Sequence, residues 1–405
     1  MLAGSQRNAV EAEFCLNSPR PISLEKIRIC HIASGDRWAG AEVQLAMLLR
    51  CLACRTDLRV SAILLNEGRL ADEVRQCGLD VCVLPESQYN SFQIALRAAY
   101  FLRGRDVQVL HSHRYKENML AAVLALRCRI PVHVCSRHGA PEPFSGWRRY
   151  KQGVIEAVNR FVAQHSVDCV VSVSEDLRRQ LVRYLPESKI VTIHNGIDLK
   201  RVFSPLSVSQ AKERLGIPAE LSVIGTVGRL EPIKRLDLFL AAAQEIATAQ
   251  PDTRFVIAGE GIEESRLRSL AASLGLEDRV LFLGHREDVY DVLRALDISV
   301  LCSDHEGLPM TLLETLYLGV PVVARPVGGV AEVIQDGVNG VCVNSSEPAA
   351  LARECIHILR DLGLRKRLVE AGTRIIGNRF SVENTAEGVV NLYRSLVGQS
   401  LDVST

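Results

Sequence analysis

The segment SDHEGLPMTLLETLYLGVPVVA occupies residues 303–324 and directly follows the apolar run ISVLC. That run predicts a buried strand, and the Gly-Leu-Pro sequence at residues 307–309 predicts a tight turn. We expect a helix to begin at about Pro309, because proline suits the first helical position, where an N–H has no helical partner. VPVVA then predicts a second strand. The segment therefore predicts a strand, a helix and a strand, the repeating unit of a parallel sheet.

The same alternation extends outward over most of the chain. Short Val/Ile/Leu-rich runs alternate with stretches of helical length, and continuous apolar runs fit strands buried on both faces. The expected strands are KIRICHI, LRVSAILL, LDVCVL, VQVLHSH, VHVCSRH, DCVVSVS and KIVTIH, followed by LSVIGTVG, RFVIAGE, RVLFLG, ISVLCSD, VPVVARP and GVCV. We expect the α/β fold class, with two tandem Rossmann-like, doubly wound parallel-sheet domains that face each other across a cleft.

The domain organisation follows from an interruption of this rhythm. Residues 195–209 contain turn residues and no apolar period, and 405 residues are too many for one ordinary core. The expected segments are a loose leader (1–24), an N-terminal Rossmann-like acceptor domain (25–196), a linker (197–209), a C-terminal Rossmann-like donor domain (210–381) and a C-terminal helix that packs back on the first domain (382–405).

The composition is that of an ordinary soluble protein, with 47% hydrophobic and 23% charged residues and a net charge of +1. Residues 1–200 hold 27 Lys+Arg against 20 Asp+Glu (+7), and residues 201–405 hold 21 against 27 (−6). This asymmetry suggests halves with different ligands, although uneven surface charge would look the same. A signal peptide and an apolar run of about 18 residues are both missing, so we expect a cytoplasmic protein, peripheral to the inner membrane face at most.

The cysteines predict no metal or disulfide framework. There are 12, and only Cys51 and Cys54 form a C-x-x-C pair, within a predicted helix and without a second pair. We expect reduced thiols here rather than a metal or redox site.

The predicted start of the helix after Pro309 is a candidate anion site. The amides of Gly307, Leu308 and Met310 would point out of a helix N-terminus that follows a strand, which suits a diphosphate. Glu306 precedes the turn and Glu314 lies eight residues later. Because a carboxylate can accept two hydroxyl hydrogen bonds, these glutamates could hold sugars on either side of the phosphates. Alternatively, they are ordinary acidic residues near a helix start, where negative charge is favoured.

A second strand-to-helix loop, GTVGRLEPIKRLD, carries the cations Arg229 and Lys234. Two cations on one such loop can neutralise a diphosphate and stabilise it as a leaving group. Taken singly, each would be interpreted as a solvated surface residue.

Two further loops follow predicted strands. In FVIAGEGIEESRL, the turn Gly259-x-Gly261 would let the backbone approach a ligand, but it is only half of a dinucleotide fingerprint. In FLGHREDVYDVL, the backbone at His285 and Arg286 could meet the edge of a base.

In combination and in order, these motifs resemble the C-terminal domain of glycosyltransferase family 4, the group 1 glycosyltransferases, which are retaining enzymes of the GT-B fold. The similarity runs from residue 225 to residue 340 and includes the spacing of Glu306 and Glu314. The first half matches more loosely, through WAGAEVQL, HSHRYKENMLAA, SRHG, VSVSEDL and HNGID. The resemblance covers roughly residues 26–398.

The resemblance implies a role for each matching residue. Arg229 and Lys234 would bind the donor diphosphate, Glu306 the donor sugar and Glu314 the ribose hydroxyls. Gly40 would face the phosphate and the acceptor, although Ala39 stands where the family usually has glycine. The implied catalytic residues are His138, which lies near the transferred sugar, Glu306, Arg229 and Lys234. The implied donor-binding residues are Gly40, Arg229, Lys234, Gly259, Gly261, His285, Arg286, Glu306, Gly307, Leu308, Pro309, Met310 and Glu314.

The implied activity is that of a retaining hexosyltransferase. It would move a sugar from a UDP- or GDP-sugar to a hydroxyl of a glycan or lipid-linked acceptor, in cell-surface or exopolysaccharide biosynthesis. We expect no cofactor and no metal, because the chain contains no D-x-D and cations with a helix terminus can replace a metal. We favour front-face attack, with the diphosphate oxygen helping to deprotonate the acceptor. Alternatives are a GT-B nucleotide-sugar epimerase and a non-catalytic nucleotide-sugar-binding protein.

Two remaining features allow several interpretations. His111 and His113 flank Ser112, but no third ligand is evident from the sequence, so a structural or sugar-contacting role is favoured over a metal site. Aromatic and basic residues mix at 144–151, from Phe144 to Lys151. They could seat on an anionic membrane near a lipid-linked acceptor, or form an exposed helix start. Single-stranded nucleic acid is another interpretation of this mixture, although we expect no nucleic-acid partner.

Overall fold

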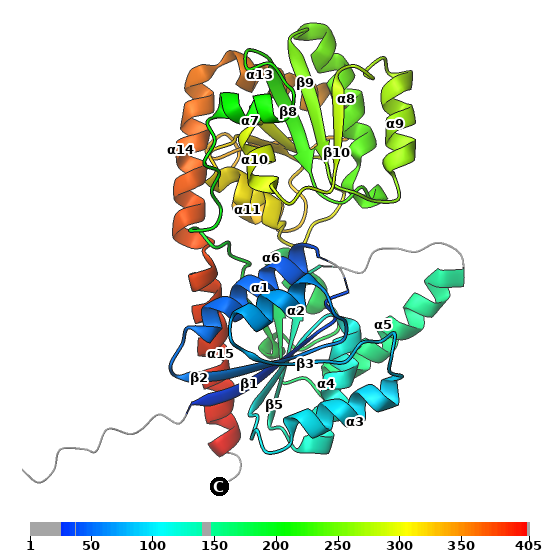
Figure 1. The fold of residues 1–405 in the computed structure, drawn as a ribbon, viewed down its shortest axis with the longest axis vertical. Helices are drawn as coiled ribbons and strands as arrows, with labels where there is room; N and C mark the ends of the chain where they lie inside the picture. Colours follow the sequence, from blue (N-terminus) through cyan, green and yellow to red (C-terminus); the bar gives the residue numbers. More distant parts are fainter. Residues whose placement is uncertain (1–25, 37, 140–146, 403–405) are drawn as a thin grey trace, which may run out of the picture.

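The computed structural model describes residues 26–36, 38–139 and 147–402, without the side chains of residues 147–152 and 401–402. Two α/β domains are stacked along the long axis of the molecule (Figure 1). The first contains a parallel sheet of seven strands and the second a parallel sheet of six. The predicted fold class is therefore confirmed. The expected leader lies outside the described residues.

In the first domain the sheet order is β3-β2-β1-β4-β5-β6-β7, so the order reverses between β1 and β4. The strands are β1 (Ile27–Ala33), β2 (Leu58–Leu64), β3 (Asp80–Val83), β4 (Val109–His113), β5 (Val132–Arg137), β6 (Cys169–Ser172) and β7 (Ile190–Thr192). The helices are α1 (Gly40–Ala53), α2 (Arg69–Gln76), α3 (Ser91–Leu102), α4 (Tyr115–Cys128), α5 (Trp147–His165) and α6 (Glu175–Leu181). One hydrophobic cluster joins the sheet to α1 and α2, and another joins it to α3 and α4. Burial of both faces accounts for the continuous apolar strands.

In the second domain the sheet order is β10-β9-β8-β11-β12-β13, which reverses between β8 and β11. The strands are β8 (Ser222–Val227), β9 (Thr253–Ala258), β10 (Val280–Gly284), β11 (Ile298–Leu301), β12 (Val322–Ala324) and β13 (Val341–Cys342). The helices are α7 (Val208–Arg214), the 3-10 turn η2 (Pro232–Lys234), α8 (Leu236–Ala249), α9 (Glu264–Ser273), α10 (Val289–Arg294), α11 (Met310–Tyr317), α12 (Val330–Val333), α13 (Pro348–Arg360) and α14 (Leu362–Arg379). Ligands of such sheets bind where the strand order reverses, so the loops after β8 and β11 are the expected site.

The C-terminal helices connect the two domains. α14 and α15 (Val382–Asp402) run along one side of the molecule, and α15 lies on the first domain (Figure 1). α15 packs against α1 and buries Tyr393 in the core of the first domain. The last described helix therefore lies on the domain that contains the first described strand.

The segment predicted as a linker at 197–209 is more ordered than its sequence suggested. The amide of Ile197 donates to the carbonyl of Phe380 at 2.8 Å, and the amide of Val382 donates back to Ile197 at 2.9 Å. Helix α7 begins at Val208, inside the predicted linker, because Ser207 and Gln210 form a capping box. The prediction of a linker up to residue 209 did not take this local capping signal into account.

Candidate active site

The loops after β8 and β11 meet at one ion pair. Nζ of Lys234 lies 2.6 Å from Oε1 of Glu306, and the hydroxyl of Ser303 donates to the same oxygen at 2.6 Å. Both loops leave neighbouring strands at the reversal of strand order, which brings residues 72 positions apart together. They line a solvent-open cavity of about 340 Å³, whose walls include Gly228, Arg229, Lys234, Ser303, Glu306 and Thr311.

The start of α11 lies beside this cavity and corrects one expectation. Pro309 is the N-cap, with φ −71° and ψ 124°, and the first helical residue is Met310. Proline fits this φ, but its extended ψ keeps it outside the helix. No side chain of the described residues caps the helix. The amide of Leu312 donates to the carbonyl of Pro309 at 3.2 Å, whereas the amides of Met310 and Thr311 come too early in the helix to have a partner within it. Leu308 and Met310 are buried and anchor the turn. The free amides suit an anion.

Close backbone packing makes glycine necessary in the turn before α11. A Cβ on Gly307 would lie 2.2 Å from the carbonyl oxygen of His138, which belongs to the first domain. A Cβ on Gly328 would lie 1.8 Å from the carbonyl of Glu306, and the amide of Gly329 donates to Gly307 at 2.8 Å. The Gly328-Gly329 loop thus supports the anion-binding turn. The sequence analysis missed it, although a Gly-Gly pair after a predicted strand is a usable signal.

Gly259 and Gly261 serve the same packing. Gly259 has φ +136°, and a Cβ there would lie 1.9 Å from the carbonyl oxygen of Gly228. A Cβ on Gly261 would lie 2.2 Å from the carbonyl of Leu230. These glycines were predicted to let the backbone approach a ligand, and the structure places them against the backbone of the loop that carries Arg229 and Lys234. They position that loop.

His285 and Arg286 follow β10 and are held by acidic neighbours. The amide of His285 donates to Oε1 of Glu260 at 3.3 Å. The guanidinium of Arg286 donates to both oxygens of Asp288, at 2.8 and 2.7 Å, and this pairing lowers the pKa of the Asp288 carboxyl. The Arg286 side chain is thus engaged within its own loop.

Glu314 lies one helical turn inside α11 and is 6% exposed. The hydroxyl of Tyr290 on α10 donates to its Oε1 at 3.3 Å. Burial raises the pKa of the Glu314 carboxyl to about 7. The carboxyl is therefore poised to change charge near neutral pH, when a polar ligand or a pH change alters its surroundings.

Arg229 lines the same cavity as Lys234, but its side chain is more exposed. Its side chain is 41% exposed, and its guanidinium lies 3.8 Å from the carboxylate of Glu231. The structure therefore places Lys234 and Glu306 in direct contact and leaves Arg229 at a more open wall of the cavity.

The first domain brings Gly40 and His138 close to the start of α11 and the turn before it. Gly40 is the first residue of α1, and a Cβ there would lie 3.7 Å from Cγ of Met310. Ala39 is the N-cap with φ −136°, an extended conformation that any residue adopts, so alanine in place of glycine causes no strain there. His138 follows β5, and its carbonyl touches Gly307.

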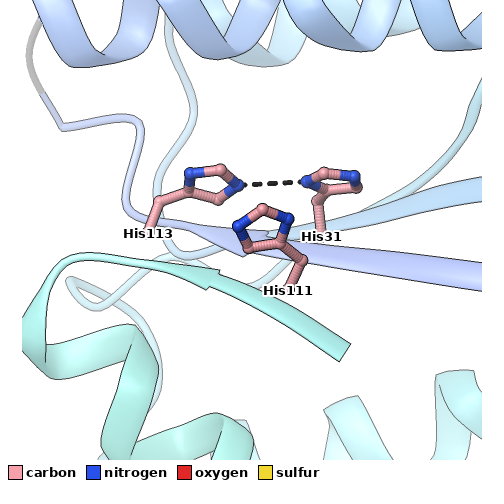
Figure 2. Close-up of side chains that lie close together, drawn as sticks. All are labelled: His31, His111 and His113. Carbon is pink, nitrogen blue, oxygen red and sulfur yellow. Dashed lines mark hydrogen bonds between the residues drawn. The ribbon is translucent and has the colours of Figure 1, made fainter. Parts of the chain in front are cut away.

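Four histidines of the first domain lie close together, and His138 is one of them. Nδ1 of His113 is 3.2 Å from Nε2 of His138, and Nε2 of His113 is 3.0 Å from Nδ1 of His31 (Figure 2). The third histidine that the sequence did not reveal is His31, which stands beside His111 in the register of β1 and β4. The ring nitrogens of His31, His111 and His113 lie within 4.8 Å of one another, close enough to hold a metal ion.

The two domains are held together near the site by Glu332 of α12. Its carboxylate accepts the amides of Glu175 and Asp176 at the start of α6, each at 2.9 Å, and Nε2 of His194 at 2.8 Å. Burial by itself raises the pKa of the Glu332 carboxyl, but these hydrogen bonds outweigh it and lower the pKa below its ordinary value. Asn195 also donates to the carbonyl of Leu308 at 3.2 Å. The sequence analysis considered residues around Asn195 but missed Glu332.

The proposed membrane-facing residues Phe144–Lys151 lie outside the described side chains. Within the part of the chain that is described, no helix has the length and apolar character needed to cross a membrane.

Two family sequence models match the chain. The model of the group 1 glycosyl transferases matches residues 207–375, and the model of Glycosyltransferase Family 4 matches residues 38–201. The D-inositol 3-phosphate glycosyltransferase of Acidothermus cellulolyticus is 31% identical over 336 residues, covering 76% of this chain and 72% of that protein. The N-acetyl-alpha-D-glucosaminyl L-malate synthase of Bacillus anthracis is 28% identical over 314 residues, covering 76% and 80%.

The fold also matches solved structures. HepE of Anabaena, solved in complex with UDP and glucose, superposes with a TM-score of 0.81 at 22% identity, covering 91% of this chain and 100% of that chain. The sucrose-phosphate synthase of Thermosynechococcus elongatus superposes with a TM-score of 0.75 at 20% identity, covering 92% and 100%.

Proposed function

This chain belongs to the group 1 glycosyl transferases of the GT-B fold, and from its cleft we propose that it transfers a sugar from a nucleoside-diphosphate sugar to an acceptor hydroxyl. The observation that carries the proposal is the Lys234–Glu306 pair, which lines a cavity beside the uncapped start of α11. A cation, free amides and a carboxylate on one cavity match a diphosphate joined to a sugar.

Each group has a role in donor binding. Lys234 and Arg229 neutralise the diphosphate, while the amides at the start of α11 hold its distal phosphate. Glu306 accepts a hydrogen bond from a sugar hydroxyl. Glu314, on α11, accepts hydrogen bonds from the ribose hydroxyls of the nucleotide.

The transfer step breaks the bond between the anomeric carbon and the diphosphate oxygen. Negative charge develops on that oxygen, and Lys234, Arg229 and the helix terminus stabilise it without a metal or cofactor. The acceptor oxygen bonds to the anomeric carbon on the face that the diphosphate leaves, and its proton passes to the departing diphosphate oxygen. The product retains the donor configuration.

The substrates we propose are a UDP- or GDP-hexose and a glycan or lipid-linked acceptor, used in cell-surface assembly on the cytoplasmic side of the membrane. The UDP and glucose bound to HepE support a donor of this type. Among further relatives is a lipopolysaccharide core biosynthesis mannosyltransferase of Rhizobium meliloti, 28% identical over 304 residues, which supports a glycan acceptor.

A thermal-shift panel of UDP-, GDP- and ADP-sugars, each measured with and without EDTA, tests the proposal. A ligand that binds the native protein raises Tm by mass action, and we expect one nucleotide class to do so regardless of EDTA. The anomeric configuration of the transferred product then tests retention. A panel in which no nucleotide sugar raises Tm would overturn the donor assignment, and a shift that EDTA abolishes would overturn metal independence.

A further inference from the structure

A buried run of hydrogen bonds in the first domain begins at Ser136. The hydroxyl of Ser136 lies 2.7 Å from Nε2 of His111, whose Nδ1 lies 2.5 Å from the hydroxyl of Tyr393. That hydroxyl is also 3.4 Å from Nε2 of His31. Tyr393 is fully buried and stands edge-on to both imidazole rings. A residue of the C-terminal helix thus links two strands of the first sheet.

The run continues from His31 through His113 to His138, the histidine that lies next to the second domain. Nδ1 of His31 is 3.0 Å from Nε2 of His113, the contact drawn in Figure 2, and Nδ1 of His113 is 3.2 Å from Nε2 of His138. Nδ1 of His138 is buried and has no hydrogen-bond partner among the described residues, which exclude 140–146. The run therefore ends at a ring nitrogen of His138 that lacks a hydrogen-bond partner among the described residues. The backbone carbonyl of the same histidine lies against Gly307.

The protonation of these rings is coupled. Burial lowers the pKa of His31 to about 3 and that of His138 to about 4, and places the pKa values of His111 and His113 well below their ordinary value. All four rings are therefore neutral, and a neutral imidazole has one donor and one acceptor nitrogen. Each hydrogen bond then determines the next, so the run has only two consistent directions.

Ser136 decides between the two directions. If its hydroxyl donates to His111, every N–H and O–H along the run meets an acceptor, up to the Nδ1–H of His138. If His111 donates instead, the Ser136 hydroxyl hydrogen has no acceptor among the side-chain hydrogen bonds of the described residues, and Nδ1 of His138 becomes an unpaired acceptor. Since buried unpaired groups are unfavourable, the first direction is preferred.

We propose that this run holds His138 in its Nδ1–H tautomer, and that Tyr393 is thereby a positioning residue for sugar transfer. The proposal rests on the proposed function and on the place near the transferred sugar that the family resemblance implies for His138. The unpaired Nδ1–H is a preorganised donor for an oxygen of that sugar. A donor fixed before the substrate arrives needs no reorganisation during the reaction.

The geometry of the histidine rings favours this run of hydrogen bonds over a metal centre. His111 and His113 are stacked, with centroids 4.5 Å apart and planes inclined by 19°, and His31 is inclined to His113 by 16°. In nearly parallel rings the nitrogen lone pairs do not converge on one point, whereas a tetrahedral metal requires convergence. The nitrogens already pair with Tyr393, Ser136 and one another.

Nitrogen-15 NMR of histidine-labelled protein, recorded without the nucleotide-sugar donor, tests the run of hydrogen bonds directly. Protonated and unprotonated ring nitrogens resonate far apart, so each tautomer can be identified. His31, His111, His113 and His138 are each expected as the Nδ1–H tautomer, with assignments from single substitutions. In Tyr393→Phe the link is broken, and His31, His113 and His138 are expected to populate the Nε2–H form together. We expect kcat to fall about tenfold or more, with little change in donor affinity, as when a histidine loses its orienting partner.

Val390→Ala is the matched control, because it truncates another fully buried side chain of α15 without touching the chain of hydrogen bonds. It is expected to lower Tm yet leave the tautomers and kcat unchanged. The proposal is overturned if wild-type His138 carries its proton on Nε2, if Tyr393→Phe leaves all tautomers unchanged, or if the purified protein contains a stoichiometric metal whose removal shifts these resonances. Failure to find a nucleotide-sugar donor would overturn the proposed function and leave the tautomer measurement readable.

Discussion

Nζ of Lys234 and Oε1 of Glu306 are 2.6 Å apart, with side-chain exposures of 22% and 10%. The pair therefore joins the loops after β8 and β11 inside the cleft. In the free protein each charge neutralises the other, and a bound diphosphate would compete with Glu306 for the ammonium group. The two residues are thus expected to respond differently to substitution.

Lys234→Ala is expected to lower kcat by about 10²–10³, because it removes a charge that stabilises the developing diphosphate anion. Steady-state transfer rates measure the effect. Lys366→Ala is the control, since that side chain is 78% exposed on α14. Transfer by Lys234→Ala within a few-fold of wild type would contradict the role of Lys234.

Glu306→Gln is expected to separate nucleotide binding from transfer. The amide keeps a group for Ser303 to bond but loses the charge that pairs with Lys234, so the nucleoside diphosphate alone should bind at least as tightly as in wild type. Transfer should fall by about 10² because the contact with the sugar hydroxyl weakens. Calorimetric titration with the nucleoside diphosphate measures the first effect. Equal losses of nucleotide binding and transfer would contradict the assignment.

Glu314→Gln is expected to stabilise the free protein in a pH-dependent way. The folded pKa of Glu314 is about 7 and its ordinary value is 4.5, so ionisation of this residue costs no stability below pH 4.5 and destabilises the fold increasingly as pH rises toward 7. Glutamine cannot ionise and escapes this loss, which approaches about 3 kcal/mol above pH 7. Denaturant unfolding at pH 5 and pH 8 measures the difference. If the difference in the free energy of unfolding between Glu314→Gln and wild type is the same at pH 5 and pH 8, the raised pKa of a buried Glu314 is refuted.

Glu332→Gln is expected to loosen the contact between the domains. The variant loses the negative charge that accepts the amides of Glu175 and Asp176, and KM for the donor should rise several-fold while each domain stays folded. Because the folded pKa lies below 4.5, the wild-type advantage is present above pH 4.5 and is lost as pH falls below it. Small-angle scattering detects domain opening. Glu370→Ala, 65% exposed on α14, is the control. Unchanged scattering and KM in Glu332→Gln would contradict the role of Glu332 in holding the two domains together.

Gly307→Ala is expected to impair transfer without unfolding either domain. Its Cβ would lie 2.2 Å from the carbonyl oxygen of His138, so the two domains must shift apart or the turn before α11 must distort. Activity should fall about tenfold or more, since small displacements in an active site are costly. Gly398→Ala, where a Cβ meets nothing within 4 Å, provides the comparison. If both alanine variants transfer sugar equally well, the close contact is not required.

Much of the fold could be predicted because its signals are local. The apolar run, turn and helix around Gly307 lie within one short segment, and Lys234 lies in a similar strand-to-helix loop. The edges of elements were less predictable, because a single ψ angle makes Pro309 the N-cap rather than the first helical residue, and a capping pair starts α7 at Val208 inside the predicted linker.

Local patterns in the sequence predicted two doubly wound domains and grouped Arg229, Lys234, Glu306 and Glu314 at or just after strand-to-helix loops, because side-chain periodicity and turn residues act over a few positions. The contacts between residues distant in the sequence became visible in the three-dimensional fold alone. Strand order in space puts His31 beside His111, and the returning helix brings Tyr393 to His31 from 362 positions away. Such contacts depend on which faces are buried against each other, a property of the whole chain that no local pattern contains.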